Sequence, residues 1–270
     1  TEIREQLDRK LPLLKELQAA AIKRWADFEQ TLPVPYESNQ AVGTHLLKLA
    51  AWALQNSLYA PRAKMTGWGS VPSKVYFPFI WGWDTPQHVI GISEWNPQQA
   101  GQILLTQYAG SNWEAPRKGS KFKVKGVTIF STARRNQIPS KIDDSLSGVF
   151  DFYSQPPLQS WAGVRVYERL ADPEEKKDFL NKLLPPLMNN LGWWERNRRL
   201  KDNSFSYLNG LESGLDDSPR FYPPSILPSF IIGLVPRFFS AVDLNCWIYQ
   251  SYLNASYLCL QAGLDEDAGI

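Results

Sequence analysis

Three carboxylates and one arginine lie within ten residues, in the segment Leu211-Glu212-Ser213-Gly214-Leu215-Asp216-Asp217-Ser218-Pro219-Arg220. Its Gly, Ser and Pro predict a loop rather than a helix interior. A carboxyl group beside a second carboxylate and an apolar wall can keep its proton near neutral pH and act as an acid. Aromatic-rich segments on both sides favour a catalytic or binding loop on a rigid scaffold. A surface turn explains the same residues equally well, because Asp216, Asp217 and Ser218 are good turn and cap residues.

The composition is that of an ordinary globular protein, with 43% hydrophobic and 21% charged residues in a chain of 270. Because 29 basic residues face 27 acidic ones, the net charge of +2 gives no electrostatic case for nucleic acid or an anionic membrane surface. Proline and arginine interrupt the longest apolar run, around residues 226–239, so no membrane span is expected. The first residue is Thr, and we expect the natural start to lie upstream. No signal peptide is visible, so the compartment is left open, with a cytoplasmic location slightly favoured.

Metal and thiol chemistry find little support. The chain has two cysteines, Cys246 and Cys259, and two histidines, His45 and His88, far apart in sequence. This count argues against a disulfide framework and a zinc site, and no metal or organic cofactor is expected. The 13% aromatic content, including 11 tryptophans, fits either a core of large side chains or indoles that line a sugar-binding cleft.

Apolar periodicity predicts an all-α protein. The expected helices cover residues 2–30, 39–59, 85–93, 97–109, 158–170, 173–198 and 241–262. The second is apolar nearly all round and should be largely buried. Asp84 or Thr85 is expected to cap the third, and residues 110–150 are expected to form a solvated hairpin or loop. Short connections between helices favour a curved array of helical hairpins.

Four motifs, in this order and spacing, resemble glycoside hydrolase family 63 across residues 38–262. They are Phe79-Ile80-Trp81-Gly82-Trp83-Asp84-Thr85, Gln155-Pro156-Pro157-Leu158-Gln159-Ser160-Trp161-Ala162, Glu212 to Arg220, and Val242-Asp243-Leu244-Asn245. The third is the most specific, and trehalases share a related form of it.

The resemblance implies an (α/α)6 barrel and an inverting, exo-acting glycosidase for α-glucosides or α-mannosides. It implies that Asp216 protonates the leaving oxygen and that an oligosaccharide or small glycoside is the substrate. The residues that the matched motifs place near the sugar are Trp81, Trp83, Asp84, Gln155, Trp161, Glu212, Gly214 and Arg220. Two roles stay open for Glu212, bonding a sugar hydroxyl or holding the loop. A turn or cap role is favoured for Asp217, and a structural role for His88.

The sequence departs from the family at the general base, which the family carries on a late glutamate near a Trp-Pro-Asn type segment that is missing here. We expect residues 1–37 to form a lead-in helix and residues 38–270 to form about seven to eight helices of the barrel. The chain is then either a fragment of a longer enzyme or the N-terminal two-thirds of a barrel that a second polypeptide completes. Asp243 is a possible but disfavoured substitute for the base. The competing function is a non-catalytic sugar-binding or scaffold protein. An isoprenoid-cyclase-like toroid lacks support, because Ser-Pro-Arg follows Asp216-Asp217.

Overall fold

The structure is a computed structural model of the chain. It describes residues 2–34, 40–61, 65, 67–77, 80–109, 112–113, 127–128, 154–208, 210–215, 218–221 and 240–264. Most of the 110–150 segment and the 222–239 segment lie outside these residues, so the expectations for them stay predictions, apart from one short hairpin in the first.

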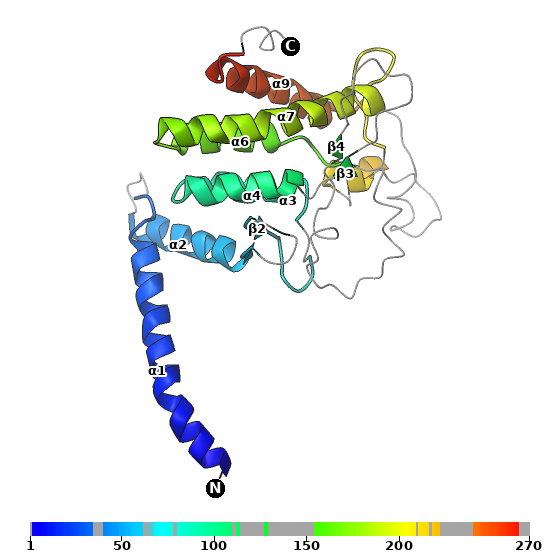
Figure 1. The fold of residues 1–270 in the computed structure, drawn as a ribbon. Helices are drawn as coiled ribbons and strands as arrows, with labels where there is room; N and C mark the ends of the chain where they lie inside the picture. Colours follow the sequence, from blue (N-terminus) through cyan, green and yellow to red (C-terminus); the bar gives the residue numbers. More distant parts are fainter. Residues whose placement is uncertain are drawn as a thin grey trace, which may run out of the picture. The chain divides into compact units, whose positions relative to one another are not determined.

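Helices dominate the described residues, which confirms the all-α prediction (Figure 1). The α-helices are α1 (Glu2–Glu29), α2 (Gln40–Asn56), α3 (Asp84–Ser93), α4 (Pro97–Ala109), α6 (Gln159–Arg169), α7 (Pro173–Arg198) and α9 (Val242–Gln261). Two short 3-10 helices are η2 (Gly210–Ser213) and η3 (Pro219–Phe221). Antiparallel pairs of two-residue strands join β1 (Leu58–Tyr59) to β2 (Gly69–Ser70) and β3 (Asn112–Trp113) to β4 (Val127–Thr128).

The chain divides into two compact units, residues 1–53 and 54–270. In the first, Trp25 packs edge-on against Trp52 at 5.7 Å between ring centroids, and Lys48 pairs with Glu29 at 2.7 Å. The expectation that α2 is largely buried was wrong, since Leu46 is 59% exposed. An apolar stripe is buried only where another element packs on it, and sequence periodicity does not reveal that partner. This division does not test the expected domain boundary after residue 37, which stays a prediction.

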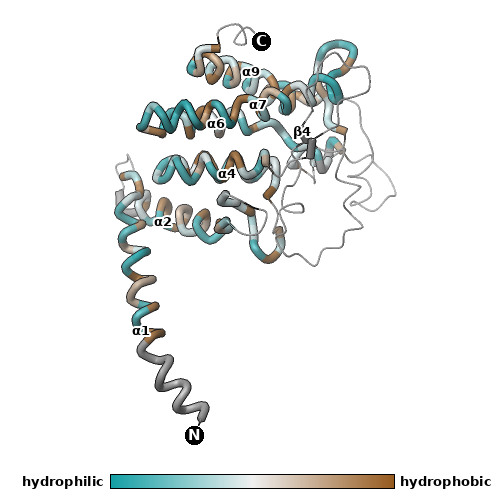
Figure 2. Tube along the Cα trace, viewed as in Figure 1, coloured by the Kyte–Doolittle hydropathy of each residue, from teal (hydrophilic) through white to brown (hydrophobic). Residues whose placement is uncertain are grey.

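In the second unit, helical hairpins stack on one another. The pairs α3–α4 and α6–α7 each join through a short connection, and α6 packs against α3, α4, α7 and α9 (Figure 1). Hydrophilic and hydrophobic residues mix along α4 and α6, as expected for helices with one apolar face (Figure 2). The largest core cluster joins these faces through fully buried side chains such as Ile103, Val166, Leu183 and Leu258.

Side-chain hydrogen bonds from neighbouring helices fix the segments that lead into α3 and α6. Gln159, in the first turn of α6, donates to the carbonyl of Gly82 just before α3 at 2.9 Å. Ser251 of α9 donates to the carbonyl of Pro157 just before α6 at 2.5 Å. The segment before α3 is therefore held by α6, and the segment before α6 is held by the middle of α9.

Local signals set several helix bounds. Asp172 caps α7 by accepting from the backbone N–H of Glu174 at 2.8 Å, and Pro173 opens the helix as predicted. The expected cap of α3 was wrong. Trp83 stands at the N-cap, Asp84 is the first helical residue, and no side chain caps the helix. Tertiary hydrogen bonds fix the Trp83 backbone instead, as described below.

His88 links α3 to the β1–β2 hairpin. Its Nδ1 lies 2.7 Å from Ser70 Oγ, which lies 3.0 Å from Ser57 Oγ. Burial lowers the pKa of His88 to about 4, below the value of about 6.5 expected in the unfolded chain. The folded state therefore favours neutral imidazole. This contribution to stability is fully present above pH 6.5 and is lost as the pH falls toward 4.

We expect His88→Gln to remove this pH dependence. The free energy of unfolding of the wild type, minus that of the variant, should fall by on the order of 2–3 kcal/mol between pH 6.5 and 4, because only the wild type takes up the proton on unfolding. Urea unfolding at a series of pH values measures the difference. Parallel curves for the two proteins would contradict the assignment.

Candidate active site

Three glutamine side chains hold the backbone of Trp81-Gly82-Trp83 before α3. Gln107 Nε2 donates to the Trp81 carbonyl at 2.7 Å, and Gln159 Nε2 donates to the Gly82 carbonyl at 2.9 Å. The Trp83 N–H donates to Gln155 Oε1 at 2.8 Å. Gln155 was predicted to bind substrate, and this backbone contact is the one the structure describes for it. Sequence reasoning missed Gln107 and Gln159 as supports, because nothing local distinguishes them from surface glutamines.

Asp84 follows this fixed backbone. Its carboxylate bonds its own backbone N–H, and among the described residues it forms no ion pair. The side chain is partly buried, and this burial raises the pKa of Asp84 above its ordinary value. Such a carboxyl group remains available to a ligand hydroxyl.

Three indoles meet at the starts of α3, α6 and α9. The ring of Trp247 lies edge-on to Trp83 at 6.0 Å and nearly parallel to Trp161 at 6.5 Å, between centroids. Trp161 is 41% exposed. We call these three residues the indole wall. Sequence reasoning missed Trp247, although it lies four residues after Asp243 and thus on the same side of α9.

The 210–221 loop lies against this wall through Gly214. Its φ of +70° is a conformation that other residues rarely adopt, and a Cβ built there would lie 2.8 Å from the ring of Trp83. The structure therefore brings together Trp83 and Gly214, two predicted site residues that are far apart in sequence.

Glu212 anchors the start of the loop. Its carboxylate is fully buried and forms two hydrogen bonds with Arg198, both 2.7 Å long. It also accepts from the backbone N–H of Ser154 at 3.0 Å and of Leu208 at 2.6 Å. Arg198 itself packs over the ring of Trp193 at 4.7 Å. Of the two roles left open for Glu212, holding the loop is the one these contacts describe.

Arg220 anchors the end of the loop. Two guanidinium nitrogens donate to the two carboxylate oxygens of Asp243, at 2.6 and 2.7 Å, and the Tyr207 hydroxyl donates to Asp243 at 3.3 Å. Partial burial alone would raise the pKa of Asp243, but the hydrogen bonds and charge of Arg220 outweigh it and hold that pKa below its ordinary value. A carboxylate stabilised in this way is a weak base.

Asp216, the predicted acid, and Asp217 lie outside the described residues. On either side of them, the backbone N–H of Ser218 donates to the carbonyl of Leu215 at 2.9 Å. The roles predicted for Asp216 and Asp217 stay predictions, and so do the sugar contacts predicted for Trp81, Trp83, Asp84, Gln155, Trp161, Glu212, Gly214 and Arg220.

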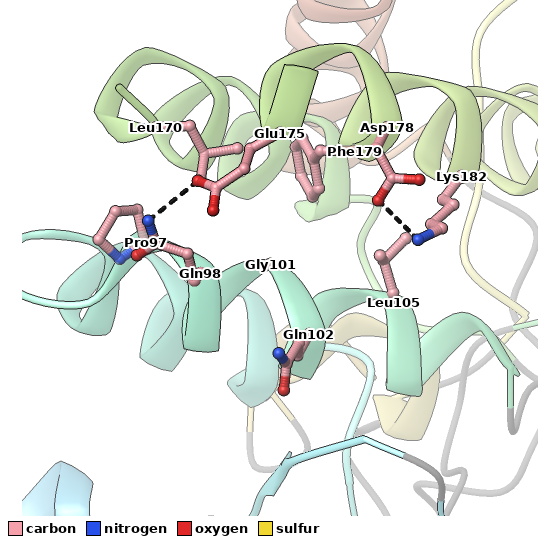
Figure 3. Close-up of a pocket in the computed structure, with 10 residues that line it drawn as sticks. All are labelled: Pro97, Gln98, Gly101, Gln102, Leu105, Leu170, Glu175, Asp178, Phe179 and Lys182. Atoms are coloured by element: carbon pink, nitrogen blue, oxygen red, sulfur yellow. Dashed lines mark hydrogen bonds and ion pairs between the residues drawn. The ribbon is translucent and has the colours of Figure 1, made fainter. Parts of the chain in front are cut away.

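Hollows elsewhere on the second unit contain none of the predicted site residues. A cavity of about 210 Å³ lies between α4 and α7, where Gln98 bonds Glu175 and Lys182 pairs with Asp178 (Figure 3). A cavity of about 290 Å³ lies near the start of α7 and the end of α9. The described residues contain no cluster of three or more potential metal ligands. No described helix combines the length and apolar character that crossing a bilayer requires.

A family profile, the mannosylglycerate hydrolase MGH1-like glycoside hydrolase domain, matches residues 77–230. This is more than half of the 270 residues, and it includes the Trp83-Asp84 segment and the whole 212–220 loop. The chain belongs to the MGH1-like glycoside hydrolase family. The resemblance to glycoside hydrolase family 63 is thereby confirmed.

Two further comparisons agree with this membership. A "probable mannosyl-oligosaccharide glucosidase" of Schizosaccharomyces pombe is 25% identical over 195 residues, which cover 57% of this chain and 24% of that protein. A family 63 mannosylglycerate hydrolase from Thermus thermophilus, solved with Tris, superimposes with a TM-score of 0.60 at 18% identity, covering 83% of this chain and 62% of that one. The same enzyme solved with glucose gives 0.58 at 17% identity, with coverage of 83% and 60%.

These matches confirm the (α/α)6 barrel fold predicted for this MGH1-like chain. The chain spans about a quarter of the length of the yeast relative and about three fifths of the bacterial one.

We expect Gly214→Ala to destabilise the protein more than Gly263→Ala. The two glycines have nearly equal φ values, +70° and +72°, but a Cβ on Gly263 meets no atom within 4 Å. Both variants take on backbone strain of about 1 kcal/mol. Only Gly214→Ala must also displace an indole, which adds about 1–3 kcal/mol. Denaturant unfolding measures the free energy of unfolding of both variants. Equal losses of stability would show that the Trp83 ring can move aside without an energetic penalty.

Proposed function

We propose that this MGH1-like chain is part of an inverting, exo-acting glycosidase. The enzyme would cleave an α-glucoside or α-mannoside, with Asp216 as general acid. Family membership and the relatives' names, an oligosaccharide glucosidase and a mannosylglycerate hydrolase, support this substrate class. The observation that carries the proposal is the contact of Gly214 with Trp83. This contact supports the proposal, because it holds the loop that would carry the acid close to Trp83, which the resemblance assigns to the terminal sugar.

Inverting hydrolysis requires a protonated acid on one side of the glycosidic bond and a base that activates water on the other. The two carboxyl groups stand roughly 6.5–9.5 Å apart, so that water fits between them. An apolar neighbour would favour the protonated acid, and Leu215 precedes Asp216 in the sequence. Asp243 is unsuited as the base, because Arg220 occupies its carboxylate. We therefore assign the base to none of the described residues.

The sugar site combines the indole wall with Asp84. Indole rings pack on the C–H face of a pyranose, and a carboxylate accepts from its hydroxyls. Asp84 suits this role because its carboxylate is only partly buried and forms no ion pair with a described residue. Trp161, with 41% of its surface exposed, is open to a ring beyond the terminal one.

Asp216→Asn tests the acid, with Asp217→Asn as the matched control one residue away. In the longest protein that the gene encodes, we expect Asp216→Asn to lower kcat on unactivated α-glycosides by about 10²–10⁴-fold. The loss should be much smaller on glycosyl fluorides, whose leaving group needs no proton. Asp217→Asn should stay near wild type.

Full activity of the Asp216→Asn protein would overturn this assignment. If neither wild type nor variant hydrolyses any glycoside on an α-glucoside and α-mannoside panel, yet both bind sugar, the non-catalytic scaffold function is favoured instead.

Trp161→Ala and Trp247→Ala test the indole wall. Each should weaken sugar binding by about 1 kcal/mol, which is five- to tenfold in Kd, because each removes one aromatic face. Trp52→Ala is the matched control, since Trp52 in α2 is 40% exposed against 41% for Trp161. Titration calorimetry with the product monosaccharide and a disaccharide measures the change. Equal changes in Kd for all three substitutions would show that the indole wall does not bind the sugar.

A further inference from the structure

Two arginine–carboxylate pairs bracket the loop that carries Asp216, one at residue 212 and one at residue 220. We propose that Asp243 is a positioning residue, which fixes the end of this loop to the start of α9 through Arg220. The proposal rests on the function proposed above for the part that concerns catalysis.

The contacts at Arg220 restrict it to one geometry. Its guanidinium forms the two-bond pair with Asp243 and lies over the rings of Tyr207 at 5.5 Å and Phe221 at 4.8 Å. Both rings are 1% exposed and belong to a buried cluster with Leu244 of α9. A planar guanidinium held by a carboxylate on its edge and by aromatic rings has little freedom to move.

The position of Asp243 makes the pair a link between two parts of the site. Asp243 lies in the first turn of α9, and Trp247 of the indole wall follows one turn later on the same side. Arg220 lies four residues after Asp216 in the chain. Asp243 thus fixes the distance between the loop of the acid and the wall that would hold the sugar.

The Arg198–Glu212 and Arg220–Asp243 pairs differ in burial. This difference makes the Arg220–Asp243 pair testable by substitution. The Arg198 and Glu212 side chains are 9% and 0% exposed, so breaking that pair leaves a buried charge and strongly destabilises the fold. The Arg220 and Asp243 side chains are both 28% exposed. Water can reach the remaining partner, so the protein should stay folded without this pair.

The geometry also separates positioning from base catalysis. Both oxygens of Asp243 face the guanidinium, whereas a general base needs an oxygen directed at the attacking water. A positioning role predicts that Asp243 and Arg220 act as a unit, so that losing either has the same effect as losing both.

Hydrogen–deuterium exchange tests the anchor without relying on activity. In Asp243→Asn, Arg220→Gln and the double variant, we expect faster exchange in peptides covering residues 213–219, to a similar extent in all three. Exchange in α6 and α7 should not change. The control is Asp202→Asn, an exposed aspartate whose side chain bonds its near neighbour Ser204. Unchanged exchange in residues 213–219 would overturn the proposal.

Kinetics of the same variants test the consequence for catalysis. Displacement of an acid by about 1 Å can lower the rate by about 10²-fold. We expect kcat on unactivated glycosides to fall about 10- to 100-fold in all three variants, with little change in KM and a smaller loss on glycosyl fluorides. Azide should not restore activity. Rescue by azide with formation of a glycosyl azide, or additive losses in the double variant, would make Asp243 the base or an independent group.

The two proposals can fail separately. Faster exchange in the variants of a protein that hydrolyses nothing would uphold the anchor and refute the glycosidase. Unchanged exchange and normal activity of Asp243→Asn in an active enzyme would refute the anchor alone.

Discussion

The buried carboxylate of Glu212 is the constraint on which the site depends. A fully buried charge is tolerated only when hydrogen bonds and an opposite charge replace water. Here Arg198 supplies two donors, and the backbone of Ser154 and Leu208 supplies two more. These residues come from the lead-in to α6, the end of α7 and the segment before η2. One carboxylate therefore fixes three segments relative to the start of the 210–221 loop.

Neutral glutamine side chains hold the backbone of residues 81–83, on the other side of the site. The backbone before α3 presents two carbonyls and one N–H, and glutamine can serve both kinds of group without burying a charge. The side chains of Gln107, Gln155 and Gln159 match these groups one to one. Trp83 thus has a fixed position against which Gly214 packs. Trp83, and not Asp84, is the N-cap residue of α3.

Helix bounds were predictable because their causes are local. The limits of α4 and α7 follow from apolar periodicity, from the prolines at their first positions and from the Asp172 cap. The prediction was wrong where the cause lay far away in sequence. Leu46 of α2 is exposed because burial needs a partner element, and Asp84 does not cap α3 because glutamines from α4 and α6, and one just before α6, hold the chain there. The Trp247 contact likewise depends on how α9 packs beside α6.

The sequence by itself determined the helices, the residue types available for acid chemistry and the family. Tertiary structure decided which charged groups are already engaged. Glu212 is bonded to a residue 14 positions away and to another 58 away, and Asp243 to one 23 away. Among the described residues, Asp84 has no ion pair, and its carboxylate bonds its own backbone N–H. The physical reason is that helix formation depends on neighbours within one or two turns, whereas the state of a carboxylate depends on burial and on partners that only the packed fold brings within hydrogen-bonding distance.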